Sequence, residues 1–314
     1  MKESEIRKHY FLDRFTIISP TRSLRPQKVC KVMTEEERKQ TCFFCPKLNK
    51  EKPIYQVSDK KGNWEVKVVE NKFPALMLKN PKAYGKQEIV IDTPKHNMEI
   101  NELSEEHIIK ILDTYIQRNK ELSKLNGIKY VLIFKNEGGR AGASIPHSHS
   151  QIIALPMVPP LVEEETMAVD KYLIEHGTCP YCDIIAAEIN STRVAWEDEH
   201  FIVICPFASE SPYGAWFMPK RHVTSIDNLN GAEKLSLAKA IKVILGKLDE
   251  IDMPYNYFFH DSLLCENQHM ILKLAPRPNI WAGLELGTGI IINSVPPEDA
   301  ARFYRGTMSS EKSE

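Results

Sequence analysis

The sequence predicts an α+β fold built from two similar halves. Its 314 residues are 42% hydrophobic and 26% charged, which is typical of a globular protein with a sizeable core. The same order of parts occurs twice along the chain: a CxxC pair, a strand pattern followed by a histidine, a helix pattern, a second strand pattern and a further histidine. Between the repeats, a proline pair and an acidic run interrupt the pattern within 157–178. We therefore expect an internal duplication, with one domain over residues 1–160 and another over 161–314.

The first half begins with Cys42 and Cys45 in CFFC. The strand-like QEIVID follows and leads to His96 in TPKH. A helix is expected after Ser104, whose hydroxyl can cap its first turn, and apolar residues keep helical spacing as far as Ile116. A buried-looking strand, KYVLIF, and a glycine-rich loop, NEGGRAGAS, then precede the HSHSQ strand.

The second half repeats these parts in the same order. Cys179 and Cys182 stand in CPYCD, and the strand GAWFM leads to His222 in PKRH. A helix pattern near 231–250 is followed by YNYFFH and by QHMILKLAP, which contains His269. In the first half, 50 residues separate the CxxC pair from the first histidine, and 50 more separate the two histidines. In the second half, the corresponding intervals are 39 and 46 residues. This agreement of order and spacing supports the duplication.

Two thiolates and two imidazoles in each half form a donor set that suits tetrahedral Zn²⁺. In a reducing compartment, CxxC pairs bind metals more often than they form disulfides. Such an ion would stabilise its half rather than take part in the reaction. The alternative for each pair is a reduced turn without metal, and His260 is a rival ligand in the second half. The expected ligands are Cys42, Cys45, His96 and His147 at the first site, and Cys179, Cys182, His222 and His269 at the second.

The HSHSQ segment carries the candidate chemistry. On an extended strand, one face would carry the side chains of His147, His149 and Gln151. The alternative is that this segment is a polar strand edge without a chemical role. If a metal takes His147, the imidazole of His149 is free to attack phosphorus and to form a phosphoramidate. Backbone N–H groups of the preceding loop, with Ser144 and Gln151, can hold the phosphoryl oxygens. Ile271 replaces the nucleophile in the second half, so we expect one active centre per chain.

Charge and hydropathy exclude several classes of function. The formal net charge of −1 and the pI near 6.8 provide no attraction to nucleic acid. No apolar stretch is long enough for a membrane span, and the first residues lack the apolar core of a secretory signal. We therefore expect a cytoplasmic protein that binds neither nucleic acid nor membranes. A phosphorylated small molecule is compatible with this composition.

Taken together, HSHSQ, CFFC, His96 in TPKH and the degenerate second half resemble the galactose-1-phosphate uridylyltransferase family, the HxHxQ transferase branch of the histidine-triad superfamily. The resemblance covers nearly the whole chain. The segments GASIPHSHSQIIALPMVPP and GLELGTGIIINSVPPEDA are also similar to plant-type ADP-glucose phosphorylase. The resemblance implies two histidine-triad-like halves, each a mainly antiparallel sheet with packed helices.

The resemblance also implies a ping-pong nucleotidyl transfer. His149 would attack the α-phosphorus of a nucleoside-diphosphate sugar and release the sugar 1-phosphate, with Gln151 contacting the phosphate. A second sugar 1-phosphate, or orthophosphate in a phosphorylase, would then take the nucleotidyl group. The main prediction is a UDP-glucose–hexose-1-phosphate uridylyltransferase. The alternatives are an ADP-glucose phosphorylase, a hydrolase of nucleotide sugars or dinucleotides, and a non-enzymatic zinc-stabilised binding protein.

Substrate contacts and assembly are implied in the same way. TRSLRP lies near the nucleotide, ENKFPAL surrounds the base and ribose, and the glutamate of GLELG binds sugar hydroxyls. The GLELG loop reaches the neighbouring subunit, so a homodimer is implied. Lys72 stands where the better-known uridylyltransferases have Asp, and Leu284 where they have Tyr, which leaves the base and the sugar open. The implied substrate-binding residues are Arg22, Arg25, Asn71, Phe73, Asn136, Ser144 and Glu285.

Overall fold

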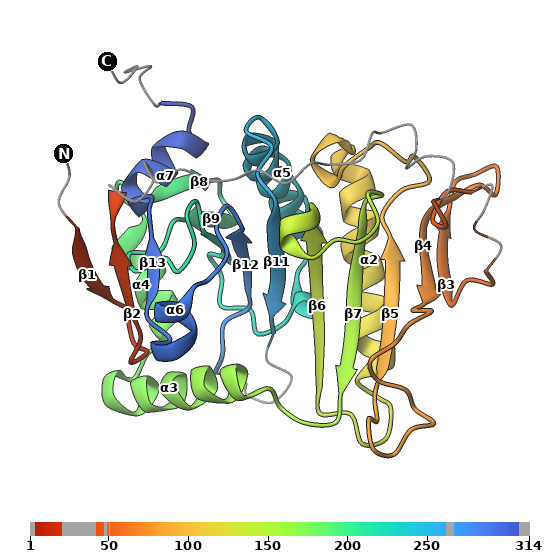
Figure 1. Ribbon diagram of the computed structural model, residues 1–314, viewed down its shortest axis with the longest axis horizontal. Helices are drawn as coiled ribbons and strands as arrows, with labels where there is room; N and C mark the ends of the chain where they lie inside the picture. Colours follow the sequence, from red (N-terminus) through yellow and green to blue (C-terminus); the bar gives the residue numbers. More distant parts are fainter. Residues whose placement is uncertain (1–3, 21–41, 47–48, 50, 262–266, 308–314) are drawn as a thin grey trace.

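The computed structural model describes residues 4–20, 42–46, 49, 51–261 and 267–307 (Figure 1). Arg22 and Arg25, expected near the nucleotide, lie outside the described residues. In the described part of the chain, a 10-stranded sheet with helices packed on it confirms the predicted α+β class. All neighbouring strands of this sheet are antiparallel.

The strand order of the large sheet shows the duplication directly. The order is β3-β4-β5-β7-β6-β11-β12-β10-β9-β8, so the second five strands repeat the first five in reverse. The halves join where β6 pairs with β11, with Asn136 opposite Asn256. The two expected sheets are therefore one continuous sheet. Its strands are β3 (Tyr55–Ser58), β4 (Trp64–Glu70), β5 (Lys86–Ile91), β6 (Tyr130–Glu137), β7 (His149–Leu155), β8 (Val194–Glu197), β9 (Phe201–Ile204), β10 (Ala215–Pro219), β11 (Tyr255–His260) and β12 (Ile271–Pro276).

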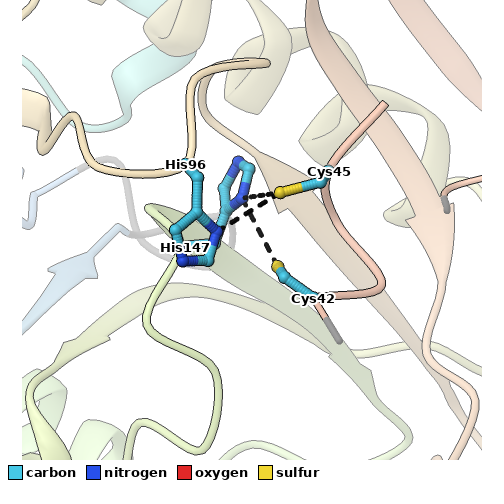
Figure 2. Close-up of side chains that lie close together, drawn as sticks. All are labelled: Cys42, Cys45, His96 and His147. Atoms are coloured by element: carbon cyan, nitrogen blue, oxygen red, sulfur yellow. Dashed lines mark hydrogen bonds between the residues drawn. The ribbon is translucent and has the colours of Figure 1, made fainter. Parts of the chain in front are cut away.

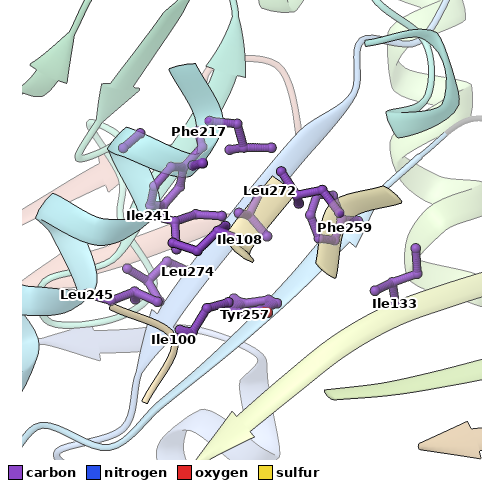
Figure 3. Close-up of a cluster of buried hydrophobic side chains, with 14 of the residues drawn as sticks. Ile100, Ile108, Ile133, Phe217, Ile241, Leu245, Tyr257, Phe259, Leu272 and Leu274 are labelled. Carbon is purple, nitrogen blue, oxygen red and sulfur yellow. The ribbon is translucent and has the colours of Figure 1, made fainter. Parts of the chain in front are cut away.

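Two long helices, α2 (Glu105–Leu122) and α5 (Gly231–Asp249), pack against each other on the same face of the sheet (Figure 1). Ser104 caps α2 as predicted, because its hydroxyl accepts a hydrogen bond from the backbone N–H of His107. Asn230 caps α5 in the same way through Glu233. The main hydrophobic core lies between these helices and the sheet (Figure 3). Its labelled members include Ile108, Ile133, Phe217, Ile241, Leu245, Phe259 and Leu272.

The ends of the described chain meet beside the second half. The strands β1 (Glu5–Lys8) and β2 (Phe15–Ile18) form a small sheet with β13 (Ile291–Asn293), which runs parallel to β2. Arg7 also pairs with Glu298 in this region. The N-terminal strands thus pack against the C-terminal part, and the division into 1–160 and 161–314 stays a prediction.

Shorter helices complete the described structure. No helix among the described residues is both long and apolar enough to cross a membrane. Figure 1 shows α3 along the lower edge of the molecule. The remaining elements are α3 (Pro160–His176), α4 (Pro180–Glu188), α6 (Gly283–Thr288), α7 (Pro297–Tyr304), η2 (Ile100–Glu102), η3 (Gly139–Ala141) and η4 (Ile226–Asn228).

Asp261, a buried residue directly after β11, should make the stability of the fold depend on pH. Burial raises the pKa of Asp261 to about 7, although hydrogen bonds from the backbone of Ile226 and from Ser225 oppose this. In the unfolded chain the pKa of an aspartate is about 3.9, so the folded state disfavours ionisation between these two values. Stability from this group is therefore lost as the pH rises from about 4 to about 7.

Replacing Asp261 by Asn should remove this dependence. We expect the free energy of unfolding of the wild type to fall relative to Asp261→Asn as the pH rises through this window, by at most about 1.4 kcal/mol per pH unit. Urea unfolding of both proteins at several pH values measures the difference. A difference that stays constant with pH would contradict the assignment.

Candidate functional site

The first cysteine and histidine cluster forms at one edge of β7. Cys42 and Cys45 lie in a turn before β3, His96 follows β5, and His147 precedes β7 (Figure 2). The Sγ of Cys45 is 3.3 Å from Nδ1 of His96 and 3.7 Å from Nδ1 of His147. The Sγ of Cys42 is 3.6 Å from Nδ1 of His147. One ligand atom from each of the four residues lies within 4.8 Å of the others.

These distances fit a tetrahedral ion. Zn–S bonds of about 2.3 Å and Zn–N bonds of about 2.1 Å place sulfur and nitrogen about 3.6 Å apart at the tetrahedral angle. Nε2 of His147 lies 2.7 Å from the carbonyl oxygen of Thr93, so this nitrogen carries the proton and donates it. The lone pair of Nδ1 then points at the sulfurs, as in histidines that bind metals. The donor set could therefore hold Zn²⁺ without rearrangement.

The second cluster repeats this geometry. Cys179 caps α4, Cys182 lies in its first turn, His222 follows β10 and His269 precedes β12. The Sγ of Cys182 is 3.4 Å from Nδ1 of His222 and 3.6 Å from Nδ1 of His269. Nε2 of His269 donates to the carbonyl of Pro219 at 2.8 Å, just as Nε2 of His147 donates to the carbonyl of Thr93 in the first cluster. All four residues again lie within 4.8 Å, and all four cysteines of the two clusters are free thiols.

The rival ligand His260 takes a different role. Its Nδ1 lies 3.0 Å from Oε2 of Glu165, and this carboxylate also binds Nζ of Lys273 at 2.7 Å. Lys273 and Ile271 occupy the positions that Gln151 and His149 have in the first half. A buried ionic cluster therefore fills the second half where the first half has its candidate nucleophile, in agreement with one active centre per chain.

His149 is placed as a nucleophile requires. It begins β7, opposite Ile91 of β5, and its side chain is 7% exposed. Nδ1 lies 2.8 Å from the carbonyl oxygen of His147 and donates to it, which leaves the lone pair on Nε2. Burial, and then the charge of Lys135, lower the pKa of His149 below its usual value. The imidazole is therefore neutral at neutral pH, which is the form that attacks phosphorus.

Side chains around His149 could hold phosphoryl oxygens. Gln151 shares the face of His149, and its Oε1 accepts from Nε2 of Gln87 at 3.0 Å, so its amide N–H groups point elsewhere. Oδ1 of Asn136 accepts from Asn256 at 2.8 Å, which likewise orients its amide N–H groups. Ser144 is exposed in the loop before β7.

The loop before β7 depends on its glycines. Gly138 and Gly142 have φ angles of +81° and +88°, in the left-handed region that disfavours other residues. A Cβ on Gly138 would also lie 2.8 Å from Cβ of Pro254. These turns lie in the loop that connects β6 to β7.

The other expected substrate residues lie at more exposed positions. Oδ1 of Asn71 accepts from the backbone of Phe73, whose side chain is 90% exposed. The backbone of Asn71 also bonds to Gln87, the residue that holds Gln151. Glu285 lies on α6, which buries none of its residues and sits beside β13 in the second half (Figure 1). Within one chain, Asn71 is thus connected to the site of His149, whereas Glu285 belongs to a separate surface.

Sequence reasoning missed several residues behind the site. Gln87 was treated only as part of a strand, although a glutamine in an apolar strand signals a polar partner. The alternation of side chains predicts that Ser148 and Ser150 face away from the histidines, but not that both are fully buried beside Lys135. Lys135 itself directly follows the apolar residues YVLIF in β6. A lysine in a buried strand requires an anionic partner, and that requirement was the available signal. The nearest partner is Asp92, at 3.0 Å, and Glu137 and Glu99 follow at 3.5 and 3.6 Å.

Comparisons with known proteins find relatives that match both halves of the chain. The family model described as galactose-1-phosphate uridyl transferase, N-terminal domain, matches residues 55–159, and the model of the C-terminal domain matches residues 165–274. The chain is 32% identical to ADP-glucose phosphorylase from Arabidopsis thaliana, over 96% of this chain and 92% of that protein. It is 31% identical to galactose-1-phosphate uridylyltransferase from Thermotoga maritima, over 78% of this chain and 85% of that protein.

Solved structures give the same pattern. The crystal structure of Arabidopsis thaliana ADP-glucose phosphorylase with bound ADP-glucose superposes with a TM-score of 0.85 and 30% identity, over 98% of this chain and all of that one. A uridylyltransferase structure superposes with a TM-score of 0.77 and 26% identity, over 96% of this chain and 98% of that one. Both similarities extend across the two halves.

The two clusters predict two separate metal sites. Cys45→Ser and Cys182→Ser should each lower the bound metal by one equivalent per chain and lower the melting temperature, because a tetrahedral site loses a thiolate. Cys205 is a buried free cysteine outside both clusters, so Cys205→Ala is the control and should keep both equivalents. Elemental analysis of the purified proteins measures the content. Unchanged metal in both serine variants would contradict the assignment.

Proposed function

Because the chain belongs to the galactose-1-phosphate uridyl transferase family, and is therefore a nucleotidyltransferase, we propose that it is a UDP-glucose–hexose-1-phosphate uridylyltransferase. It moves uridine monophosphate from UDP-glucose to a hexose 1-phosphate, such as galactose 1-phosphate, through a covalent bond to His149. The observation that carries this proposal is the hydrogen bond from Nδ1 of His149 to the carbonyl of His147, which directs the Nε2 lone pair outward.

The proposed reaction has two displacements at phosphorus. Nε2 of His149 attacks the α-phosphorus of UDP-glucose, the P–N bond forms, and the bond to the bridging oxygen breaks with release of glucose 1-phosphate. A phosphate oxygen of the incoming hexose 1-phosphate then attacks the same phosphorus, and the P–N bond breaks. The imidazole gains positive charge in the intermediate, so the bond from Nδ1–H to the His147 carbonyl strengthens there.

Neighbouring groups stabilise the charge on the phosphoryl oxygens. We assign this role to the amide groups of Gln151 and Asn136, to the hydroxyl of Ser144 and to the backbone N–H groups of the loop before β7. The Gln87 and Asn256 contacts support the assignment, since each occupies an amide oxygen and leaves amide N–H groups to donate.

We propose that both clusters bind Zn²⁺ as structural sites. At the first, Cys42, Cys45, His96 and His147 would hold the ion, which supplies folding energy when bound. His147 lies two residues before His149, so the cluster also fixes the start of β7. Cys179, Cys182, His222 and His269 would hold the second ion in the degenerate half.

The remaining substrate contacts are proposed from the family. Phe73, which is 90% exposed, offers an aromatic face to the base beside Asn71. Arg22 and Arg25 are assigned to the nucleotide, and Glu285 to the sugar hydroxyls. Further expectations are a cytoplasmic location, in keeping with free thiols in both clusters, and no partnership with nucleic acid or membranes.

The exposed segment around α6 supports a homodimer. Ile280, Trp281 and Leu286 are 87%, 44% and 74% exposed, which is unusual for apolar side chains within one short segment. Glu285 lies among them. A second copy that covers this segment would bury these side chains and bring Glu285 to the site of its partner.

An ADP-glucose phosphorylase is the second candidate. The relative of that name in Arabidopsis thaliana matches over 96% of this chain, and its structure with bound ADP-glucose has the higher TM-score of the two compared above. Lys72 also replaces the aspartate of the better-known uridylyltransferases next to Asn71. In this case orthophosphate, rather than a hexose 1-phosphate, would discharge the nucleotidyl-histidine.

A labelling experiment distinguishes the candidates. UDP-glucose and ADP-glucose, each with ³²P in the α-phosphate, are incubated separately with the protein, and label that is labile to acid but stable to base marks a phosphoramidate. We expect label from UDP-glucose that galactose 1-phosphate discharges; label from ADP-glucose that orthophosphate discharges would establish the phosphorylase. His149→Ala should abolish labelling, whereas His176→Ala, at the exposed end of α3, should not. No label from either donor would refute both candidates.

The dimer proposal has its own test. Leu286→Asp should shift the protein from dimer to monomer in sedimentation analysis, because a carboxylate cannot be buried without a partner. Leu161→Asp is a matched control, since Leu161 is also exposed, at 60%, but lies on α3. A monomeric wild type, or equal dissociation of both variants, would count against the α6 interface.

A further inference from the structure

We propose that a buried ionic network behind β7 positions His149 for nucleotidyl transfer and that folding of the chain does not require this network. The proposal rests on the proposed function, and it concerns residues on the sheet face opposite the candidate nucleophile. The members are Asp92, Lys135, Ser148 and Ser150, with Tyr115 and Tyr257 beside them and the partly exposed carboxylates of Glu99 and Glu137 within 3.6 Å of Nζ of Lys135.

Lys135 is the centre of the network. Its side chain is 0% exposed, and its Nζ donates to Oδ2 of Asp92 at 3.0 Å and to Oγ of Ser148 at 2.8 Å. The same ammonium lies 3.4 Å from the carbonyl oxygen of His149. One buried cation therefore contacts both the residue before the nucleophile and the nucleophile's own backbone.

Asp92 binds the two serines that face away from His149. Its carboxylate accepts from Oγ of Ser148 at 2.9 Å and from Oγ of Ser150 at 3.3 Å. The backbone N–H of Asp92 also donates to the carbonyl of Ser148 at 3.1 Å. Because side chains alternate along a strand, these serines hold β7 from behind while His149 faces the site.

The register of the sheet shows where this attachment matters. Pairing between β6 and β7 ends with Lys135 opposite Ser150, one residue short of His149. The β7 strand itself begins at His149. The contact of Nζ of Lys135 with the carbonyl oxygen of His149 thus adds a link between β6 and β7 one residue beyond their backbone pairing.

A buried ionic network is an unfavourable way to fill a core. Desolvation of two charges offsets most of their attraction, and apolar residues of similar size are often as stable or more stable. Burial acts to lower the pKa of Lys135, but Asp92, followed by Glu99 and Glu137, raises it well above its usual value. Lys135 therefore stays charged, and its presence calls for a reason other than packing.

The second half provides an internal comparison. Phe259 lies opposite Leu272 in the register that corresponds to Lys135 opposite Ser150. Met270 stands in place of Ser148, and β10 ends in Met218 and Pro219 where β5 leads to Asp92. All five of these side chains are apolar and buried.

The comparison separates the fold from the chemistry. The same strand arrangement folds around apolar residues in the half where Ile271 replaces the nucleophile, and around the ionic network in the half that has His149. The network therefore accompanies the nucleophile. Its physical effect is to fix the backbone of residues 147–150, and with it the carbonyl of His147 that orients the ring of His149.

The test removes the central pair together, since removing one of the two would leave the other buried without its partner. The carboxylates of Glu99 and Glu137, 3.6 and 3.5 Å from Nζ of Lys135, belong to side chains that are each 26% exposed, so they are left in place. In the double variant Lys135→Met with Asp92→Asn, we expect the single-turnover rate of nucleotidylation at saturating donor to fall about ten- to a hundred-fold, as for other orienting contacts. The donor concentration for half-maximal rate, the metal content and cooperative unfolding should be retained. Loss of binding without loss of maximal rate would contradict positioning.

A second buried ion pair serves as the matched control. Arg118 binds Glu88 through hydrogen bonds of 2.7 and 2.8 Å, between α2 and β5, and both side chains are nearly inaccessible. Glu88 lies opposite Ile152, beyond the residues that Lys135 and Asp92 hold. Arg118→Met with Glu88→Gln should lower the melting temperature and leave the maximal rate of nucleotidylation unchanged.

Ser148 offers a milder test that keeps both charges. Ser148→Ala should slow nucleotidylation without loss of fold, and Ser148→Thr, which keeps the hydroxyl, should recover part of the rate. A wild-type rate in Ser148→Ala and in the folded double variant would overturn the proposal, and failure of the double variant to fold would contradict the claim that the fold is independent of the network. If the wild type takes no label from any donor, the proposed function fails instead.

Discussion

The two-residue period of β7 is the constraint on which the rest of the site depends. Side chains two positions apart share a face, so His149 and Gln151 lie on one face of β7 and Ser150 lies on the other, while His147 and Ser148 stand directly before the strand. One imidazole turns Nδ1 toward two sulfurs, while the other uses Nδ1 to donate to the backbone. The candidate metal cluster therefore lies at the start of this short strand, the proposed nucleophile on one face of it and the polar contacts of Ser150 on the other.

The duplication shows which of these features belong to the fold. Both halves keep the CxxC cluster, the histidine that donates to a backbone carbonyl, and the capped helix that covers the sheet. In the second half Ile271 stands in the position of His149, apolar residues stand in the positions of the network behind it, and Glu165, His260 and Lys273 form an ionic cluster. The cluster, the capped helix and the order of strands are thus common to both halves, and the residues proposed for the reaction lie where the halves differ.

Features with a local signal could be predicted from the sequence. The CxxC pairs, the histidines at matching intervals, the alternation in HSHSQ and the Ser104 cap each depend on neighbouring residues or on the repeat. The pairing of β6 with β11, which makes one sheet from two halves, joins strands far apart in the sequence and was not predicted. The partners of Lys135 were missed for the same reason, because they depend on the register of three strands. The sequence alone leaves His260 as a rival ligand, because its contact with Glu165 of α3, in the segment between the halves, has no local signal.

The central claim is that His147 and His149, two residues apart at the start of β7, divide two tasks between them. A crystal structure of the protein after reaction with a nucleotide sugar tests this claim most directly. Data collected at the zinc absorption edge should show an ion held by Nδ1 of His147 with Cys42, Cys45 and His96. The same map should show continuous density from Nε2 of His149 to the phosphorus of a nucleotide. An ion bound to His149, or a nucleotide attached to any other residue, would contradict the account.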